Sequence, residues 1–430
     1  MRKWNSWAGL IAKDGLRKAK SVLFLCLLAV FIPTKTAAVP AQFSEKPKVR
    51  AITAFIRLDR ARYEEQIRET LAVLRKGKAA LEQAGYEVQT LRITTQPFPE
   101  YIRGLSHEEA LAFFRDYDRL VAREGFVAAI GPAMLSDSDD PRQAELLGEI
   151  LVAAPHLDAS LIVAGDDGVH WKAVRAAAKM VKYLAERTPH SQGAFHFAAA
   201  AMVPPLTPFY PASYHTGAGR QFGIALQSAN VVAEVFAAVH SPAGAKVALT
   251  AALAHDARKI EAIARNLEKE TGWAYQGIDL SPAPLKDVSI GEAIEKLTGS
   301  KFGSSGTITA ASLITEVLRS LPVKRTGYSG LMLPVLEDAV LARRWSEGGI
   351  SVDALLAYSA VCGTGLDTIP LPGDISEEQL ERIIGDMGSL AVKLHKPLSA
   401  RLLPVRGKKP GDKTEFDDPM LVNAVLQPLP

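Results

Sequence analysis

The stretch "VRAITAFIRLDRARYEEQIRETLAVLRKGKAALEQAGYEVQTLRITT" (residues 49–95) contains the pattern that decides the fold class. Residues 49–58 form an apolar run typical of a buried strand, and residues 61–85 carry apolar side chains at helical spacing up to Gly85. Residues 87–95 alternate between apolar and polar and predict a second strand. A strand, a helix and a strand in succession predict an α/β protein in which helices cover a sheet.

The same alternation continues along the rest of the chain. Ser106, followed three residues later by Glu109, predicts a capping box at the start of a helix. Residues 222–240 are predicted to form a helix, and residues 353–361 ("DALLAYSAV") an inner strand. Because no internal repeat or low-complexity linker interrupts these elements, residues 42–430 are predicted to form one large α/β domain.

The first 41 residues have the composition of a secretory signal peptide. A basic flank that ends at Lys20 precedes the short apolar run "VLFLCLLAVFI" (residues 22–32), and small residues then allow cleavage after Ala41 or Ala38. The run is shorter than the roughly 20 residues of a membrane-spanning helix. We therefore expect an exported protein, periplasmic or extracellular, that meets a membrane only through this signal; an uncleaved N-terminal membrane anchor is the alternative.

Charge and cysteine content both change if this signal is removed. Residues 1–41 hold seven of the 50 basic residues and one of the 47 acidic ones, so the net charge falls from +3 to −3. No basic stripe with interleaved aromatic residues remains, and we expect no nucleic-acid partner. Cys26 would be lost with the signal, which leaves Cys362 without a partner for an intramolecular disulfide.

Six segments together resemble one protein family, DUF711, also called UPF0210. They are "VQTLRITTQPF", "TPFYPASYH", "GSSGTITAASLITEVLRSLPV", "GYSGLMLPVLEDAVLARR", "YSAVCGTGLDTIPLPGD" and "KPLSARLLPVRGKKPGD", in the order expected of the family. The resemblance implies a fold related to pyruvate formate-lyase and other glycyl-radical enzymes. It therefore implies one α/β barrel of about ten strands, surrounded by helices, with a site inside the barrel. It implies no particular reaction.

The segment "KRTGYSG" is similar to the arginine, glycine and tyrosine signature of the glycyl-radical enzymes. Here Arg325, Gly327 and Tyr328 are spaced one residue short, and Cys362 follows the glycine instead of preceding it. We therefore favour a tight backbone turn that leads into a helix beginning near Leu331.

Cys362 is the first candidate for catalysis, as a nucleophile or as an acid or base. It ends the predicted inner strand and opens the flexible sequence "CGTG", and such positions often carry function in α/β folds. His215, in the rigid loop "TPFYPASYH", and His196 are candidate bases for it. The alternative is a buried cysteine that only packs, which is the commoner fate of a free cysteine.

Two groups of carboxylates come next. Asp367 lies in "LDTIPLPGD", predicted to be a rigid loop, and is a candidate catalytic carboxylate, whereas Ser376 is the predicted cap of the following helix. Asp166, Asp167 and His170 form a weak metal pattern that is equally explained by a helix N-terminus, so we predict no metal site.

An anion-binding cluster is the last candidate feature. Arg92 and Arg401 could offer planar guanidinium groups to a carboxylate. A glycine-serine loop at the start of a helix could offer backbone N–H groups. That loop consists of Gly303, Ser304, Ser305, Gly306 and Thr307. Because it lacks the lysine of a P-loop, a nucleotide is not expected, and the sequence names no cofactor.

Two functions of different kinds follow from these candidates. The first is an exported enzyme that acts on a small anionic metabolite inside the barrel, with Cys362, His215 and Asp367 as catalytic residues. The second is a non-catalytic protein that binds a small molecule on the same scaffold. A structural role in a homo-oligomer is a weaker third alternative.

Overall fold

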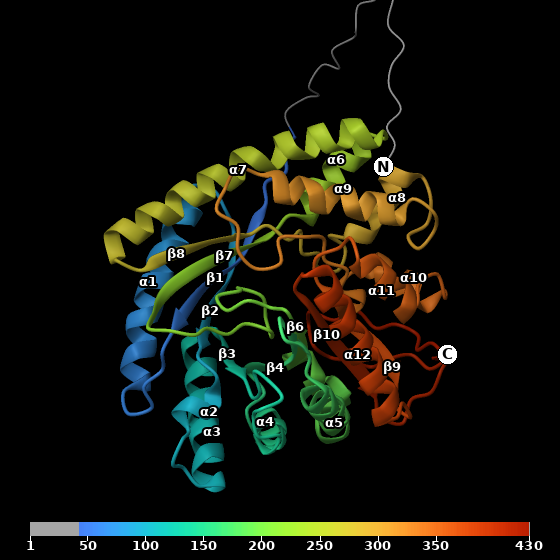
Figure 1. Ribbon diagram of the computed structural model, residues 1–430. Helices are drawn as coiled ribbons and strands as arrows, with labels where there is room; N and C mark the ends of the chain where they lie inside the picture. Colours follow the sequence, from blue (N-terminus) through green and yellow to red (C-terminus); the bar gives the residue numbers. More distant parts are fainter. Residues whose placement is uncertain (1–42, 430) are drawn as a thin grey trace, which may run out of the picture. The chain divides into compact units, whose positions relative to one another are not determined.

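The computed structural model of the protein describes residues 43–429, and the predicted signal peptide with Cys26 lies outside these residues (Figure 1). One ten-stranded mixed sheet runs through the described chain in the order β8-β7-β1-β2-β3-β4-β6-β10-β9, with the short β5 paired to β4. The α/β class predicted from residues 49–95 is confirmed.

Five neighbouring parallel strands form the centre of the sheet. They are β1 (Lys48–Ile56), β2 (Val88–Thr95), β3 (Val127–Pro132), β4 (Leu157–Gly165) and β6 (Phe197–Ala201). Two parallel pairs flank them in the opposite direction, β7 (Gly219–Gln227) with β8 (Ala274–Asp279) on β1, and β10 (Leu398–Val405) with β9 (Gly365–Pro372) on β6. The hairpin strand β5 covers Gly168–Val169.

The two edge strands of this sheet are β8 and β9. They do not pair with each other, so the strand pairing is open and does not show the closed barrel that was expected. Residues 325–334 nevertheless reach both edges. Arg325 makes an isolated parallel bridge with Ile278 on β8, and Pro334 makes one with Asp367 on β9.

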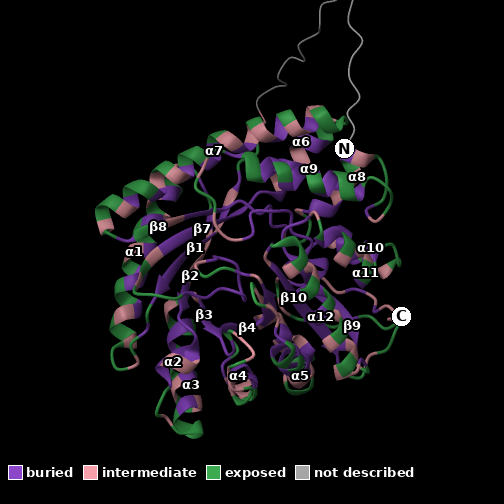
Figure 2. Ribbon diagram, viewed as in Figure 1, coloured by how far each residue is buried: buried purple, intermediate pink, exposed green. Residues whose placement is uncertain are grey.

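Helices cover the outer face of the sheet. The first group is α1 (Tyr63–Gln83), α2 (Phe98–Tyr101), α3 (His107–Glu124), α4 (Arg142–Ala153), α5 (Trp171–Arg187), α6 (Ala229–Ala238) and α7 (Pro242–Thr271). The second is α8 (Ile290–Thr298), α9 (Thr307–Ser320), α10 (Ala339–Ser346), α11 (Val352–Ser359) and α12 (Glu377–Leu394), with short 3₁₀ turns η1 (Pro189–His196) and η2 (Val335–Glu337). Figure 2 shows buried strands inside helices whose outer sides are exposed. The predicted capping box at Ser106 and the predicted cap at Ser376 are confirmed.

The opposite, inner face of the sheet packs on loops. A second hydrophobic cluster joins Ile162 of β4 and Ala198 of β6 to residues of the proline-rich loop 203–215 and to Tyr328 and Met332. The same loop is tied to β2 through polar groups, since the Thr94 hydroxyl lies 2.8 Å from the Tyr210 hydroxyl. In Figure 1 the sheet curves around these loops, which pack against its inner face. A cavity lies beside the loops.

Two sequence predictions of secondary structure are wrong. Residues 222–240 are not one helix, because residues 219–227 form strand β7 on β1 and only α6 is helical. The expected inner strand 353–361 is helix α11, whose first turn is capped by the Ser351 side chain. Short apolar runs fit either structure by pattern alone, and here pairing and capping decide.

The predictions for the two following segments fail in the same way. Residues 365–372, expected to be a loop, form strand β9 beside β10. No helix begins near Leu331; α10 begins at Ala339, where the carboxylate of Asp338 accepts hydrogen bonds from two backbone N–H groups of the first turn.

Candidate functional site

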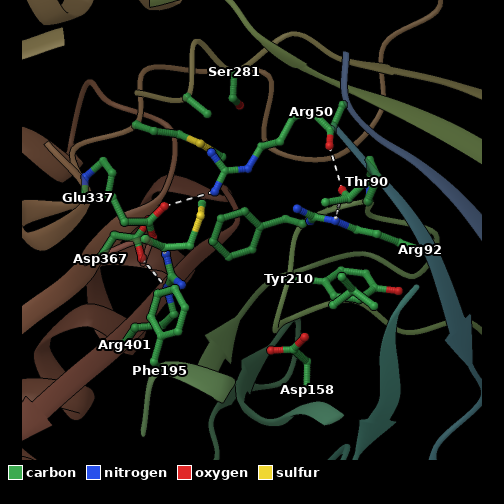
Figure 3. A pocket seen from close by; sticks show the side chains of 18 of the residues that line it. Arg50, Thr90, Arg92, Asp158, Phe195, Tyr210, Ser281, Glu337, Asp367 and Arg401 are labelled. Carbon is green, nitrogen blue, oxygen red and sulfur yellow. Dashed lines mark hydrogen bonds and ion pairs between the residues drawn. The ribbon is translucent and has the colours of Figure 1, made fainter. Parts of the chain in front are cut away.

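A cavity of about 300 Å³ lies on the inner face of the sheet. Strands from both halves of the sheet contribute charged side chains to it. These side chains include Arg50 of β1, Arg92 of β2, Asp158 of β4, Asp367 of β9 and Arg401 of β10. Figure 3 shows them facing one another across the space, with Glu337 and Tyr210 among them.

One wall of the cavity is a buried ion network centred on Arg401. Its Nε donates to Asp367 at 2.5 Å, and its Nη2 donates to Glu337. Glu337 also accepts from Arg50 at 3.0 Å, which leaves two guanidinium groups on two carboxylates. Arg401 packs against the rings of Phe195 and Phe209, with 5.0 and 5.7 Å from its guanidinium carbon to the ring centres.

The two carboxylates of this network differ in their affinity for a proton. Burial raises the pKa of Asp367, and the charge of Glu337 adds to this effect while Arg401 opposes it. Burial also opposes the charge of Glu337, but the positive charges of Arg401 and Arg50 outweigh it and lower the pKa of Glu337. Paired carboxyl groups whose environments separate their pKa values in this way can act as an acid and a base.

Arg92 stands on the opposite wall and lacks a carboxylate partner within residues 43–429. Its Nε donates to the Thr90 hydroxyl at 3.1 Å, and its guanidinium group lies 4.8 Å above the ring of Tyr210. Burial and the nearby positive charge of Arg50 lower the pKa of Arg92 to about 10. The guanidinium stays protonated at neutral pH and presents an unneutralised charge to the cavity.

A histidine and an aspartate form the third polar group of the cavity. Nδ1 of His196 lies 3.2 Å from a carboxylate oxygen of Asp158. Burial opposes the charged form of His196, but the hydrogen bond and the charge of Asp158 outweigh it and raise the pKa of His196. The pair can therefore hold or release a proton.

Four of the residues selected from the sequence line this cavity, namely Arg92, His196, Asp367 and Arg401. Four others were missed, namely Arg50, Asp158, Tyr210 and Glu337. A usable signal existed for two of them. Arg50 and Asp158 are charged residues near the start of otherwise apolar strands, and strands covered on both faces hold few charges without a specific partner.

Cys362 does not line the cavity. It is fully buried in the main hydrophobic core, three residues after the end of α11. The nearby ammonium group of Lys396 donates to the backbone carbonyl of Cys362 and, at 2.7 Å, to that of Ser359. The backbone around the thiol is thus held by a buried lysine.

His215 does not line the cavity either. Its ring is buried, and Nε2 bonds the carbonyl oxygen of Ile56 at the end of β1. Burial lowers the pKa of His215, so the neutral ring is favoured. The described residues contain no hydrogen bond between His215 and Cys362.

The glycine-serine loop is on the outer layer at the start of α9 and does not line the cavity. Thr307 closes this loop locally, because its hydroxyl accepts from the backbone N–H of Gly303 at 3.1 Å. Ser304, Ser305 and Gly306 are exposed. The structure therefore separates this loop from Arg92 and Arg401.

The "KRTGYSG" segment is shaped around a buried carboxylate. Asp279, at the end of β8, accepts hydrogen bonds from the backbone N–H groups of Tyr328 and Ser329 at 3.0 and 3.1 Å. Gly327 has φ +63°, and a Cβ at this position would collide with that carboxylate. Glycine is required here because the backbone turns tightly around Asp279.

Within residues 43–429, His, Cys, Asp and Glu side chains nowhere gather in a group of three that could hold a metal ion. No helix in the same residues is long and apolar enough to cross a membrane.

The fold and the cavity define the chain as an α/β protein with a charged pocket on the inner face of a mixed sheet. Residues 43–417 match the family model described as "Uncharacterised ACR (DUF711)". The chain is 33% identical over 347 residues to a UPF0210 protein of Pyrobaculum arsenaticum, with 76% of each chain covered, and 33% identical to one of Pyrobaculum aerophilum, with 79% of each covered. A UPF0210 protein of Desulforudis audaxviator is 31% identical, with 77% of each covered. The chain belongs to the DUF711 (UPF0210) family, as the sequence motifs predict.

Proposed function

We propose that this protein is an enzyme that binds a small anionic metabolite in the interior cavity and transfers a proton to or from it. The observation that carries the proposal is Arg92, a charged group directed at the cavity with no carboxylate partner in the described chain. A partly buried charge without a partner is costly, and an anion between Arg92 and Arg50 would relieve the repulsion between the two guanidinium groups.

The size of the cavity limits the ligand. Pockets for drug-sized molecules range from about 300 to 1,000 Å³, and this cavity of about 300 Å³ is at the lower limit. A metabolite of a few carbon atoms with one or two anionic groups fits this volume better than a nucleotide or a peptide.

Asp367 and Glu337 supply the proposed acid and base. The raised pKa of Asp367 keeps its carboxyl group protonated at higher pH than an ordinary aspartate, and Glu337 stays ionised beside Arg50. An anion on Arg92 and Arg50 would bring its neighbouring atoms close to this pair, which is the arrangement that general acid–base catalysis requires. Cys362 and His215 are not part of this proposal, since neither lines the cavity.

Binding is tested first, by isothermal titration of the purified protein with small carboxylates and with inorganic phosphate. We expect Arg92→Met to weaken carboxylate binding at least tenfold, because it removes the charge and keeps most of the side-chain volume. The matched control is Arg265→Met, which removes an arginine stacked on Tyr275 at 5.6 Å outside the cavity. No binding by the wild type, or equal binding by Arg92→Met, would refute the proposal.

Catalysis is tested on any ligand that binds. Proton transfer should appear in ²H₂O as deuterium incorporation into the bound carboxylate, followed by nuclear magnetic resonance. Asp367→Asn should slow incorporation at least a hundredfold while the dissociation constant changes less than threefold. Binding without any incorporation would favour the second function.

That second function is a non-catalytic binding protein. It is supported by the ion network itself, because Asp367 and Glu337 are already paired through Arg401 and could serve only to hold the cavity wall. In that case Asp367→Asn would reduce stability and leave bound ligands chemically unchanged.

We also propose that the protein is exported and that its sheet closes as a barrel related to the glycyl-radical enzymes. Export rests on the first 41 residues, and mass spectrometry of the secreted or periplasmic protein should find an N-terminus at residue 42 or 39. Barrel closure is supported by residues 325–334, which bridge to both edge strands. A radical activity is not part of the proposal.

A further inference from the structure

A second group in the cavity, a carboxylate with one hydrogen bond among the described residues, complements Arg92. Asp158 is on β4 and Arg92 is on β2, and β3 lies between these two strands. On β3, Val127 pairs with Arg92 and Ala129 pairs with Asp158. Neighbouring strands are about 4.8 Å apart, so the two backbones are separated by roughly 10 Å across the sheet. Figure 3 shows Arg92, Tyr210 and Asp158 following one another along the same side of the cavity.

The carboxylate of Asp158 is only 8% exposed, yet it makes a single hydrogen bond within residues 43–429, with His196. A carboxylate has two oxygens and room for several donors. The other oxygen has no donor among the described residues, and because Asp158 lines the cavity, this oxygen is suited to a donor on the ligand.

The charges around Asp158 favour a neutral donor. The hydrogen bond and the charge of Asp158 raise the pKa of His196 against the effect of burial, and a proton held on His196 offsets the charge of Asp158. The other charged groups that act on His196 are Asp418 and Arg401. Arg401 and Arg92 are both cations, and they would repel an ammonium group at this position.

From these contacts we infer that the ligand is a hydroxycarboxylic acid, with its carboxylate on Arg92 and its hydroxyl group donating to Asp158. This inference rests on the proposed anion-binding function and names its substrate class. The carbon atoms between the two groups would lie against the ring of Tyr210 and the side chain of Val127, which are apolar surfaces of the same wall.

The test compares three matched series of ligands by isothermal titration at pH 7. The hydroxy acids are lactate, 3-hydroxybutyrate and malate; the amino acids are alanine, 3-aminobutyrate and aspartate; the unsubstituted acids are propionate, butyrate and succinate. We expect at least one hydroxy acid to bind tenfold or more tightly than both matched compounds. Asp158→Ala should reduce this preference below threefold while binding of the unsubstituted acid is retained.

The control variant is Asp118→Ala, which breaks another aspartate–histidine pair, with His156 at 3.1 Å, that does not line the cavity. It should leave the tenfold preference intact. If Asp158→Ala does not fold, Asp158→Asn, which keeps the shape but not the charge, should show an intermediate preference.

The outcomes separate the two proposals. Equal affinity for all three series, or a preference for the amino acids, would overturn the hydroxy-acid inference and leave anion binding standing. A preference that survives in Asp158→Ala would overturn it as well. No binding of any carboxylate would overturn both proposals.

Discussion

At the scale of the residue, Asp367 shows how position alone changes an ordinary side chain. The same carboxyl group in an exposed loop would ionise near pH 4. On β9, opposite Glu337, burial raises its pKa although Arg401 donates to it. Catalytic groups are commonly adjusted in this way, and structural ion networks show similar shifts.

This shift has a consequence for stability. Because the folded protein holds the Asp367 proton more tightly than the unfolded chain, the contribution of this group is complete below pH 4 and is lost as the pH rises through the folded pKa. We expect Asp367→Asn, which cannot ionise, to remove this loss. Urea unfolding of the wild type and the variant between pH 4 and 8 measures the difference.

Glu337 contributes with the opposite sign, since its folded pKa is lowered, and it is present in both proteins. The comparison between variants therefore reports the titration of Asp367 together with its interaction with Glu337. Parallel stability curves for the two proteins would contradict a raised pKa at this position.

At the scale of the element, the end of α11 depends on a buried cation. Lys396 donates to the carbonyls of Ser359 and Cys362, which lie at and just beyond the last turn of the helix. Burial lowers the pKa of Lys396. Helix ends leave carbonyl groups without partners inside the helix, and this ammonium group supplies donors to two of these buried carbonyls.

Lys396→Met should therefore cost about 1–3 kcal/mol, because it leaves buried carbonyl groups without a donor. It should also speed alkylation of the Cys362 thiol, which is fully buried in the wild type. Denaturant unfolding and the alkylation rate measure the two effects. The control Lys393→Met, an exposed lysine in the last turn of α12, should change stability by less than about 0.5 kcal/mol. Similar losses in both variants would contradict a capping role.

The turn around Asp279 gives a second prediction at this scale. Gly327→Ala should cost more than Gly104→Ala, since both glycines have positive φ but only Gly327 has atoms within reach of a new Cβ. The backbone alone costs about 1–2 kcal/mol, and the collision with Asp279 adds to it. Thermal unfolding of both variants gives the difference, and equal costs would show that the turn can relax.

The elements also explain what the sequence could predict. Long periodic segments such as α1 were assigned correctly because their pattern exceeds the length of a strand, and the start of α3 was assigned from its capping box. Residues 353–361 and 222–227 were misassigned because an apolar run of this length fits both structures. The pairing of β7 with β1 joins residues far apart in the chain, and local pattern does not contain this information.

The site was partly predictable for a related reason. Arg92 and Arg401 were selected because their planar guanidinium groups suit a carboxylate, and the fold places both on the cavity. Glu337 contacts Arg401, which is 64 residues away in the sequence, and Arg50, which is 287 residues away. A local sequence pattern does not contain such contacts. Cys362 was selected because it was expected to end an inner strand, and that expectation failed with the strand.

At the scale of the whole molecule, the C-terminal segment belongs to the same structure as the sheet. Leu421, Ala424 and Leu426 are buried in the main core, and the backbone N–H of Val422 donates to the carbonyl of Leu336 at 2.7 Å. The preceding residues 418–420 line the cavity. This C-terminal segment therefore helps to form the site.

Leu426→Ala should accordingly destabilise the protein by about 2–4 kcal/mol, like other large-to-small changes in a core. Leu394→Ala, at a leucine that is 40% exposed, should cost less than about 1 kcal/mol. Leu426 does not line the cavity, but residues 418–420 of the same segment do, so Leu426→Ala should also weaken carboxylate binding in the titration that tests Arg92. If stability falls without any change in affinity, the segment is a structural support only, and the cavity wall holds its shape independently of the C-terminus.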